Sequence, residues 1–179
     1  SPDGRVSYKL SQSIQWMANG LDSENRDIYV KNEMWAFTAE EKVSQDQVSG
    51  HESVLTEDKR QQYMEALSSV DSATDFTMTK IGRDVNYSWV SGDKSRVYTL
   101  TKSYAKVEGR TEVVGRWDFN TQMRVRRSAV EAAAGKLPPG IEKDQYLAAL
   151  TDTASWTKYT LTISGNELNY KWTGRNGAR

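Results

Sequence analysis

Apolar and polar residues alternate in two matching stretches, each divided by a glycine. In residues 76–80, Phe and Met alternate with Thr, and Gly82 separates this run from a second alternating run that ends near Trp89. Residues 159–172 have the same order, with Gly165 at the centre. A period of two is typical of a strand with one buried face, and glycine favours a tight turn. The pattern therefore predicts two antiparallel hairpins, each with an aromatic face.

An apolar stripe with helical spacing precedes each hairpin. Residues 58–70 have apolar side chains at positions i, i+3, i+4 and i+7, and residues 146–150 repeat part of this pattern, so each segment is predicted to be a helix. The strand-like stretches that come before the helices are residues 6–16, 28–38, 96–107 and 112–126. Residues 43–54 and 128–134 leave the element type open, and the second segment could be helical.

The two halves of the sequence resemble each other. After a shift of 83 positions, 12 of the 28 residues in the range 62–89 are identical to their counterparts in the range 145–172. About two identities would be expected by chance from average residue usage. A weaker match sets residues 35–37 against residues 117–119. We interpret the pattern as an internal duplication.

These patterns predict an α+β fold that is rich in sheet and built from two tandem ββαββ-type repeats. Residues 1–93 would form the first repeat and residues 94–179 the second, with one helix per repeat. No segment rich in Gly, Ser or Pro divides the chain near residue 93, which favours one compact unit. We expect a pseudo-symmetric antiparallel arrangement, in which the apolar sheet faces pack against each other or against the two helices.

The composition excludes several kinds of chemistry. The chain has no cysteine, which rules out disulfides, thiolate nucleophiles and zinc–thiolate sites. It contains six Trp and nine Tyr, and burying these side chains requires a real core. No run of about 18 apolar residues is present, so we expect no transmembrane segment. Cysteine-free chains rich in Ser, Thr, Gln, Trp and Tyr are common among exported bacterial proteins, and we therefore expect a periplasmic or secreted protein.

Charge is balanced over the whole chain but unevenly distributed. The net charge is zero, with 24 residues of each sign. Residues 22–75 hold 13 acidic and five basic residues, a net of −8, whereas residues 94–136 hold ten basic and four acidic residues, a net of +6. Equivalent parts of the two proposed repeats have therefore diverged to opposite signs.

The basic segment contains the candidate ligand-binding residues. If residues 116–126 form an alternating strand, Arg116, Arg124 and Arg126 share one face, and Lys102 and Tyr104 share one face of a neighbouring strand. Such a surface could bind an anionic partner, either nucleic acid, an acidic polysaccharide or a lipid head group. The alternative is a solvated sheet face that pairs with the acidic half, in the same molecule or in a second one. A pI of 6.6 favours this alternative, since nucleic-acid binders commonly exceed 9.

Catalytic patterns are scarce. His51 is the single histidine, so a histidine-based metal site is excluded, and we expect this residue at the surface or in an interface. No nucleophile elbow or phosphate-binding glycine loop is present. Adjacent carboxylates such as Glu40 and Glu41 would point apart on a strand. The sequence indicates no catalytic residue, metal or cofactor. The aromatic pairs Tyr87/Trp89 and Tyr170/Trp172 could form ligand platforms, but we interpret them as core residues.

Three functional hypotheses follow. The leading one is a non-enzymatic binding protein that acts through protein–protein contacts, of the inhibitor, immunity or envelope-assembly type. The second is a binder of an anionic polymer or lipid head group through the basic strand. The third is a carboxylate-dependent glycan hydrolase, which would need two carboxylates about 5–10 Å apart in a cleft.

Overall fold

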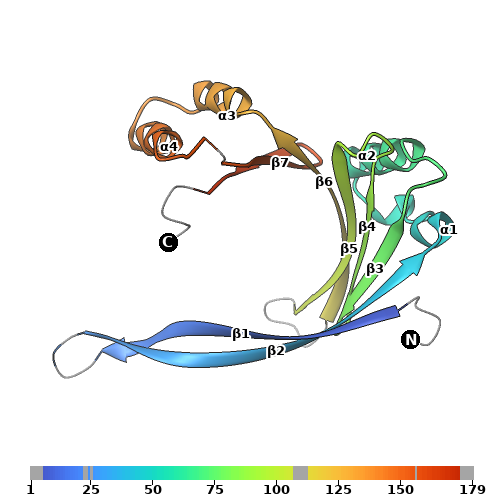
Figure 1. Cartoon of the computed structure of the whole chain (residues 1–179), viewed down its shortest axis with the longest axis horizontal. Coiled ribbons are helices and arrows are strands. Elements are labelled where there is room, and N and C mark those ends of the chain that lie inside the picture. The colour runs from blue at the N-terminus through green and yellow to red at the C-terminus, as the bar shows by residue number, and fades with distance from the viewer. Residues whose placement is uncertain (1–5, 22–23, 25, 107–112, 156, 174–179) are drawn as a thin grey trace.

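The computed structural model describes residues 6–21, 24, 26–106, 113–155 and 157–173. In this part of the chain, eight strands form one antiparallel sheet whose spatial order is the same as their order in the sequence (Figure 1). The strands are β1 (Val6–Leu21), β2 (Asp27–Val43), β3 (Phe76–Ile81), β4 (Asp84–Val90), β5 (Arg96–Lys106), β6 (Val113–Val125), β7 (Tyr159–Ser164) and β8 (Glu167–Lys171). The sheet-rich, antiparallel α+β fold that the sequence predicts is confirmed.

Helices lie in the two connections between strands that are not hairpins. The connection from β2 to β3 contains α1 (Gln45–Val48), the 3₁₀ turn η1 (Glu52–Val54) and α2 (Glu57–Ser68). The connection from β6 to β7 contains α3 (Arg127–Ala133), the 3₁₀ turn η2 (Ala134–Lys136) and α4 (Ile141–Thr151). The sheet curves strongly, and both helical groups cover its convex side, so its concave side has no helical cover (Figure 1).

The prediction of one helix per repeat is wrong, because each helical connection contains two α-helices. The additional helices, α1 and α3, have four and seven residues, which is too short for an apolar period to be visible in the sequence. Local bonds and one buried side chain hold each of them. In α1 the Gln47 side chain accepts a hydrogen bond from the Ser44 backbone N–H at 3.0 Å, and Val48 is fully buried. In α3 the buried residue is Val130.

The larger core lies between α2 and the middle of the sheet. Its buried members come from α1, the residue after η1, α2 and strands β3 to β6, and they are Val48, Leu55, Tyr63, Ala66, Phe76, Trp89, Tyr98, Leu100 and Phe119. The alternating pattern explains the selection, since Phe76, Trp89 and Phe119 occupy the helix-facing side of their strands. The Tyr63 hydroxyl donates a hydrogen bond to the Val48 carbonyl, which ties α2 to α1.

The smaller core lies between the second helical group and the end of the sheet. Val130, Leu150 and Tyr159 are its buried members, and half-buried aromatic rings from α4 and the end of β8 pack against them. The Tyr146 hydroxyl donates to the Val130 carbonyl at 2.6 Å. The aromatic hairpin residues therefore serve as core in both places, as interpreted from the sequence.

The concave side of the sheet has a different composition. Neighbouring strands place Thr77 opposite Ser88 and Asn86 opposite Thr101, and these side chains bond across the strands with oxygen–oxygen distances of 2.8 and 2.9 Å. The centre of the concave side is therefore polar, whereas exposed apolar residues on the same side, Ile81, Val90 and Val97, lie near the strand ends.

Candidate functional site

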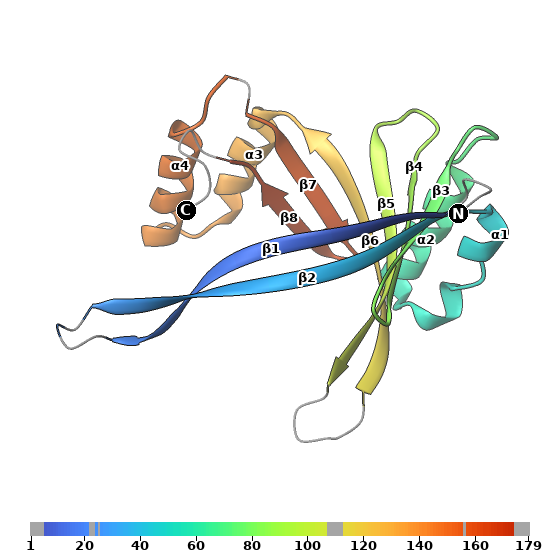
Figure 2. The same ribbon diagram turned by 60° about the horizontal axis from the view of Figure 1, so that its bottom comes forward.

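The first two strands extend beyond the rest of the sheet. β2 pairs with β3 only over Thr38–Val43, whereas it pairs with β1 along almost its whole length. We call β1 together with residues 27–37 of β2 the arm. Figures 1 and 2 show the arm leaving the sheet as a two-stranded ribbon. In the described pairing, no third strand covers this part of β2 or the outer edge of β1.

One face of the arm carries large apolar side chains that none of the described helices covers. Strand register places these residues on one side of the ribbon, and each is between 50% and 65% exposed. They are Tyr8, Leu10, Ile14, Tyr29, Trp35 and Phe37. The rings of Tyr8 and Phe37 stack with centroids 5.8 Å apart. The opposite face also has exposed apolar residues, at Ile28, Val30 and Met34.

Charges on the apolar face of the arm are locally neutralised. Glu33 forms an ion pair with Lys31 and accepts a hydrogen bond from the Gln12 amide at 3.1 Å. These three residues share the face of Trp35 and Tyr29, because residues of equal parity along a strand point the same way. The face is therefore apolar with a neutral polar group within it.

The structure distributes the five predicted ligand-binding residues over more than one location. Lys102 pairs with Trp117 and Tyr104 with Gly115, so Lys102 and Tyr104 lie on the convex side, together with the aromatic core. Arg116 and Arg124 alternate with these positions on β6 and are about 26 Å apart along the strand, at roughly 3.3 Å per residue. Arg126 is exposed beyond the end of β6, as the residue that precedes α3.

Three of these residues nevertheless line one pocket. Lys102, Tyr104 and Arg116 are joined there by Trp117 and by Lys59 from the start of α2. We call this space, of about 610 Å³, the aromatic–cationic pocket. Arg116 can reach it because β7 pairs with β6 only from Thr121 onwards, which leaves the edge of β6 open beside Arg116.

Packing of aromatic rings determines the shape of the aromatic–cationic pocket. The Lys102 Nζ lies 5.3 Å from the ring centroid of Tyr104 and 5.4 Å from that of Trp117, an arrangement in which the ring faces attract the ammonium group. The Tyr104 ring lies across Gly115, where an added Cβ would be 3.0 Å from Tyr104 Cε1 and 3.3 Å from Lys102 Cε. Glycine at this position therefore allows the tyrosine and the lysine to pack against β6.

His51 supports the aromatic–cationic pocket from inside. Its ring contacts Trp117 and Tyr87, with centroid distances of 4.4 and 5.8 Å. The Nε2 atom is buried and has no hydrogen-bond partner among the described residues. His51 is partly buried, because the segment around η1 folds back over the sheet and brings the ring against Trp117. Its expected place in an interface stays a prediction.

One of the three lysine and arginine side chains in the aromatic–cationic pocket is neutralised. Lys59 forms an ion pair with Asp118, and the lysine side chain is only 17% exposed. Neither Lys102 nor Arg116 has an ion pair within the part of the chain that the structure describes.

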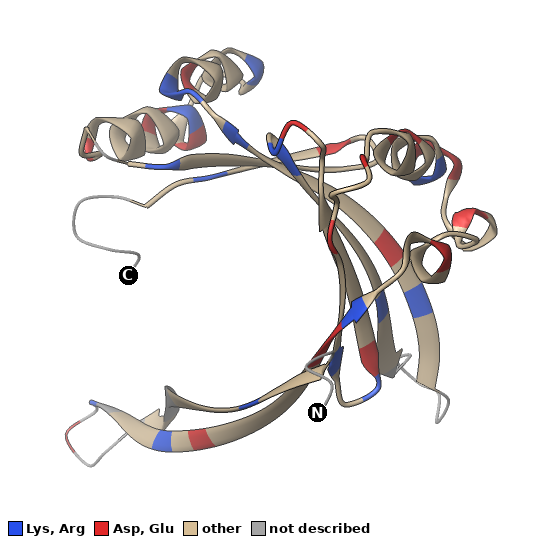
Figure 3. Cartoon of the chain, turned by 45° about the vertical axis from the view of Figure 1, so that its right-hand side comes forward, with Lys and Arg blue, Asp and Glu red and all other residues tan. Residues whose placement is uncertain are grey.

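A second cationic pocket lies at the other end of β6. Lys94, Arg124 and Lys158 line a space of about 650 Å³. All three side chains are exposed, and the described residues that line this pocket include no aromatic ring. The predicted basic strand is thus represented by two separate cationic surfaces. In Figure 3, by contrast, Asp and Glu occur along the α1–η1–α2 segment.

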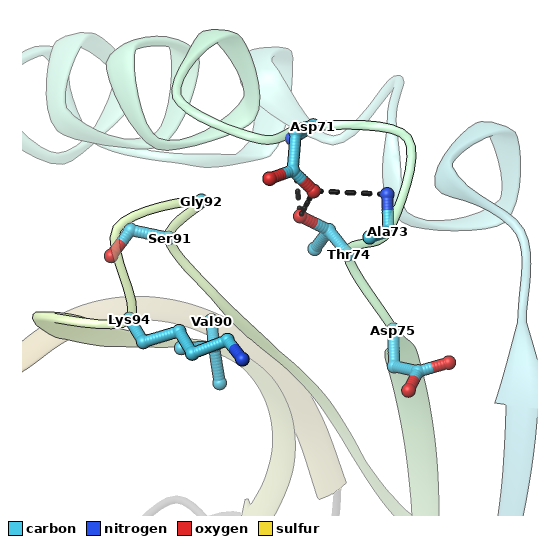
Figure 4. Close-up of a pocket in the computed structure, with 8 residues that line it drawn as sticks. All are labelled: Asp71, Ala73, Thr74, Asp75, Val90, Ser91, Gly92 and Lys94. Atoms are coloured by element: carbon cyan, nitrogen blue, oxygen red, sulfur yellow. Dashed lines mark hydrogen bonds between the residues drawn. The ribbon is translucent and has the colours of Figure 1, made fainter.

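A third pocket, of about 320 Å³, contains two carboxylates, those of Asp71 and Asp75 (Figure 4). Asp71 accepts hydrogen bonds from the backbone N–H of Ala73 at 2.9 Å and from the Thr74 hydroxyl at 3.2 Å. Asp75 forms an ion pair with Lys42 at 3.0 Å. Both groups therefore hold the loop before β3 in place, and this pocket gives no specific support to the hydrolase hypothesis.

The described residues show neither a membrane-spanning helix nor a metal site. None of the described helices has the length and apolar character needed to cross a bilayer, and the described residues contain no group of three or more His, Asp or Glu residues that could hold a metal ion. Comparisons with protein-family models, curated protein sequences and solved structures find no match.

The sequence patterns missed the exposure of the arm. Both strands of the arm were expected, at residues 6–16 and 28–38, but an alternating strand is normally taken to have one covered face. The signal was in the lengths: the strands of the arm have 16 and 17 residues, whereas their neighbour β3 has six.

Proposed function

We propose that this chain is a non-enzymatic binding protein that acts through protein–protein contacts, and that the arm is its contact surface. The observation that carries the proposal is the uncovered apolar face of six large side chains. At about 200 Å² for each large side chain, their exposed parts amount to roughly 700 Å², close to the approximately 800 Å² that each partner contributes to a standard interface. Patches of this size mark interaction sites on folded proteins.

The composition of the arm favours a protein partner over a lipid surface. Aromatic residues are enriched in the centres of protein interfaces, and the arm presents Tyr8, Trp35 and Phe37 together. A bilayer interior would disfavour the Lys31–Glu33 pair, which lies within the same face. In a protein interface, this pair and Gln12 can keep their hydrogen bonds while the surrounding apolar area is buried.

The partner we propose encloses the arm. Both faces of the ribbon expose apolar side chains, and the described pairing leaves the outer edge of β1 open. A flat contact would cover only one of these surfaces. A groove that receives the ribbon, or strands that add to its edges, would cover the apolar faces and satisfy the free backbone groups. We propose that this chain is of the inhibitor, immunity or envelope-assembly type and contacts its partner in this way.

We also propose that the chain arose by duplication of a ββαββ unit, with residues 1–93, which include the arm, and residues 94–179 as the two copies in a pseudo-symmetric arrangement. Hydrogen bonds at matched positions support this proposal. Tyr63 and Tyr146, 83 positions apart, both donate to a carbonyl of the preceding helix. The indole N–H groups of Trp89 and Trp172 donate to Ala66 and Ala149 at 3.5 and 3.4 Å, and these alanines are also 83 positions apart.

A binding experiment with matched variants tests the function of the arm. The immobilised chain is incubated with an extract of its source cells, in parallel with the double variant Trp35→Ser/Phe37→Ser and the control Ile141→Ser. Ile141 is 76% exposed on α4 and lies outside the arm. We expect a protein that is retained by the wild type and the control and is lost at least tenfold with the arm variant. Once purified, this protein should show the same order of affinities.

Two results would contradict the proposal. Equal retention by the arm variant would mean that the partner binds elsewhere. A stable dimer of the purified wild type that dissociates in the arm variant, measured by analytical ultracentrifugation, would mean that a second copy of this chain occupies the arm.

A further inference from the structure

We infer that the aromatic–cationic pocket binds an anionic group, a carboxylate or a phosphate, through Lys102 and Arg116. The inference is independent of the arm, because the pocket lies where η1 and α2 meet β5 and β6. Of the five predicted ligand-binding residues, Lys102, Tyr104 and Arg116 line this pocket.

The positive charge of the pocket favours an anion. Three basic residues line the pocket, and no acidic residue is among its described lining residues. Asp118 neutralises Lys59, so the positive charges of Lys102 and Arg116 remain without an ion-pair partner among the described residues. Two like charges at the rim of one pocket repel each other, and an anion between them would remove that repulsion.

The Lys102 side chain is preorganised for binding. Lys102 is held between the rings of Tyr104 and Trp117, and these rings in turn pack on Gly115 and His51. A lysine that is already held loses less side-chain entropy on binding than a free one. The aromatic walls also exclude water from one side of the ammonium group, which strengthens its attraction for an anion.

The hydrogen-bond donors of Arg116 and Lys102 match the oxygens of a carboxylate or a phosphate. The guanidinium of Arg116 offers parallel N–H donors that suit two oxygens of a carboxylate or phosphate, while the ammonium of Lys102 contributes a point charge. The volume of about 610 Å³ is within the range of small-ligand sites. A carboxylate or phosphate on a small molecule or at the end of a chain therefore fits the pocket.

The second cationic pocket has the charges without the other features. Lys94, Arg124 and Lys158 are all exposed, and no aromatic residue is among the described residues that line their pocket. We therefore assign the anion site to the aromatic–cationic pocket, and Arg124 provides a matched control on the same strand.

An NMR titration of the full chain tests the assignment. The probes are inorganic phosphate, acetate and, in a separate sedimentation assay, vesicles that contain phosphatidylglycerol. We expect phosphate or acetate to shift the indole N–H signal of Trp117, identified with a Trp117→Phe variant. Binding of the free anions without sedimentation would indicate a small anion, whereas phosphate binding together with vesicle sedimentation that is lost in Arg116→Gln would indicate a lipid head group.

Three variants distinguish specific binding in the pocket from nonspecific attraction of an anion to the positive charges of the chain. Lys102→Met keeps the aliphatic stem against the rings and removes the charge, and Arg116→Gln removes the second charge on an exposed side chain. Each should weaken binding about tenfold, or about 1.4 kcal/mol, whereas Arg124→Gln should change it less than twofold. Equal losses in Arg124→Gln and Arg116→Gln would overturn the inference, and so would the absence of any Trp117 shift in the wild type. If Lys102→Met fails to fold, the comparison of Arg116→Gln with Arg124→Gln decides the question.

Discussion

The two helical cores use closely related residues but are buried to different extents. In the larger core, Trp89 is 1% exposed and Tyr63 is fully buried. Their counterparts in the smaller core, Trp172 and Tyr146, are only half-buried. The number of strands that contribute to each core accounts for the difference. Strands β5 and β6 add Tyr98, Leu100 and Phe119 to the larger core, whereas the described strand residues of the smaller core come from the end of β6, from β7 and from β8.

Similar local sequences therefore differ in burial because their neighbours in the sheet differ. The central core is enclosed by four strands, while the terminal core is enclosed by the end of β6 and by one hairpin. The same substitution at two equivalent positions should therefore have unequal effects. Pairs of matched variants measure that inequality directly.

The largest difference is expected for the tryptophans. Trp89 contacts four other aromatic rings with centroid distances from 5.5 to 6.4 Å, so Trp89→Ala should lower the free energy of unfolding by about 3–5 kcal/mol. Trp172→Ala should lower it by about 1–2 kcal/mol, because water already reaches part of the ring. Denaturant unfolding followed by circular dichroism measures both values. Equal losses would show that the two cores are equally well packed.

A smaller difference is expected for the turn glycines. Gly82 and Gly165 both have positive φ angles, +61° and +57°, and alanine costs about 1 kcal/mol in this conformation. Gly165 also packs against α2: its backbone N–H and carbonyl both bond to the Gln62 side chain, at 3.2 and 2.8 Å. An added Cβ would be 2.0 Å from Asp58 Oδ2. Gly165→Ala should therefore cost about 2–4 kcal/mol and Gly82→Ala about 1 kcal/mol.

Thermal unfolding of the two glycine variants checks this order. The double variant Gly165→Ala/Asp58→Ala should recover part of the loss, because the clash is with the Asp58 carboxylate. If Gly82→Ala proves as destabilising as Gly165→Ala, the contact between the β7–β8 turn and α2 does not contribute to stability.

The smallest difference is expected for the two tyrosine hydroxyls. Tyr63→Phe leaves the Val48 carbonyl without its donor in a fully buried position, which should cost about 1–3 kcal/mol. Tyr146→Phe should cost about 0.5–1.5 kcal/mol, because the half-buried Tyr146 lies where water can partly replace the lost bond.

Alkaline pH provides a second measurement of the same pair. Burial raises the pKa of Tyr63 above the ordinary value of 10.0, and burial followed by the nearby Tyr170 raises the pKa of Tyr146. Because the folded state favours the neutral hydroxyl, this contribution to stability is complete below pH 10 and is lost as the pH rises through the raised pKa. Urea unfolding above pH 10 should show a less steep loss of stability in Tyr63→Phe than in the wild type. An unchanged slope would contradict the role of burial.

Much of the scaffold was predictable because its signals are local. The alternation in residues 76–89 and 159–172 specifies hairpins, and the stripes around Tyr63 and Tyr146 specify helices. The short helices were less predictable, since α1 and α3 have too few turns to show a period. The sequence indicates that residues 128–134 could be helical, and they form most of α3, whereas it leaves the element type of residues 43–54 open. The candidate site was partly predictable. Lys102, Tyr104 and Arg116 were selected from their charge and alternation, but the pocket also needs Lys59 and Trp117, which come from other segments.

Local sequence patterns specify which residues form strands, which form the two long helices, and which faces are apolar, because these properties depend on contacts within a few positions of the chain. What covers each apolar face depends on the packing of distant segments. The strands in the middle of the sheet received α2 on one side and flanking strands on both edges, so Trp89 became core. The arm extends past β3, beyond the reach of any described helix, so Trp35 and Phe37 remained exposed. Burial depends on distant segments, and no local pattern can specify it.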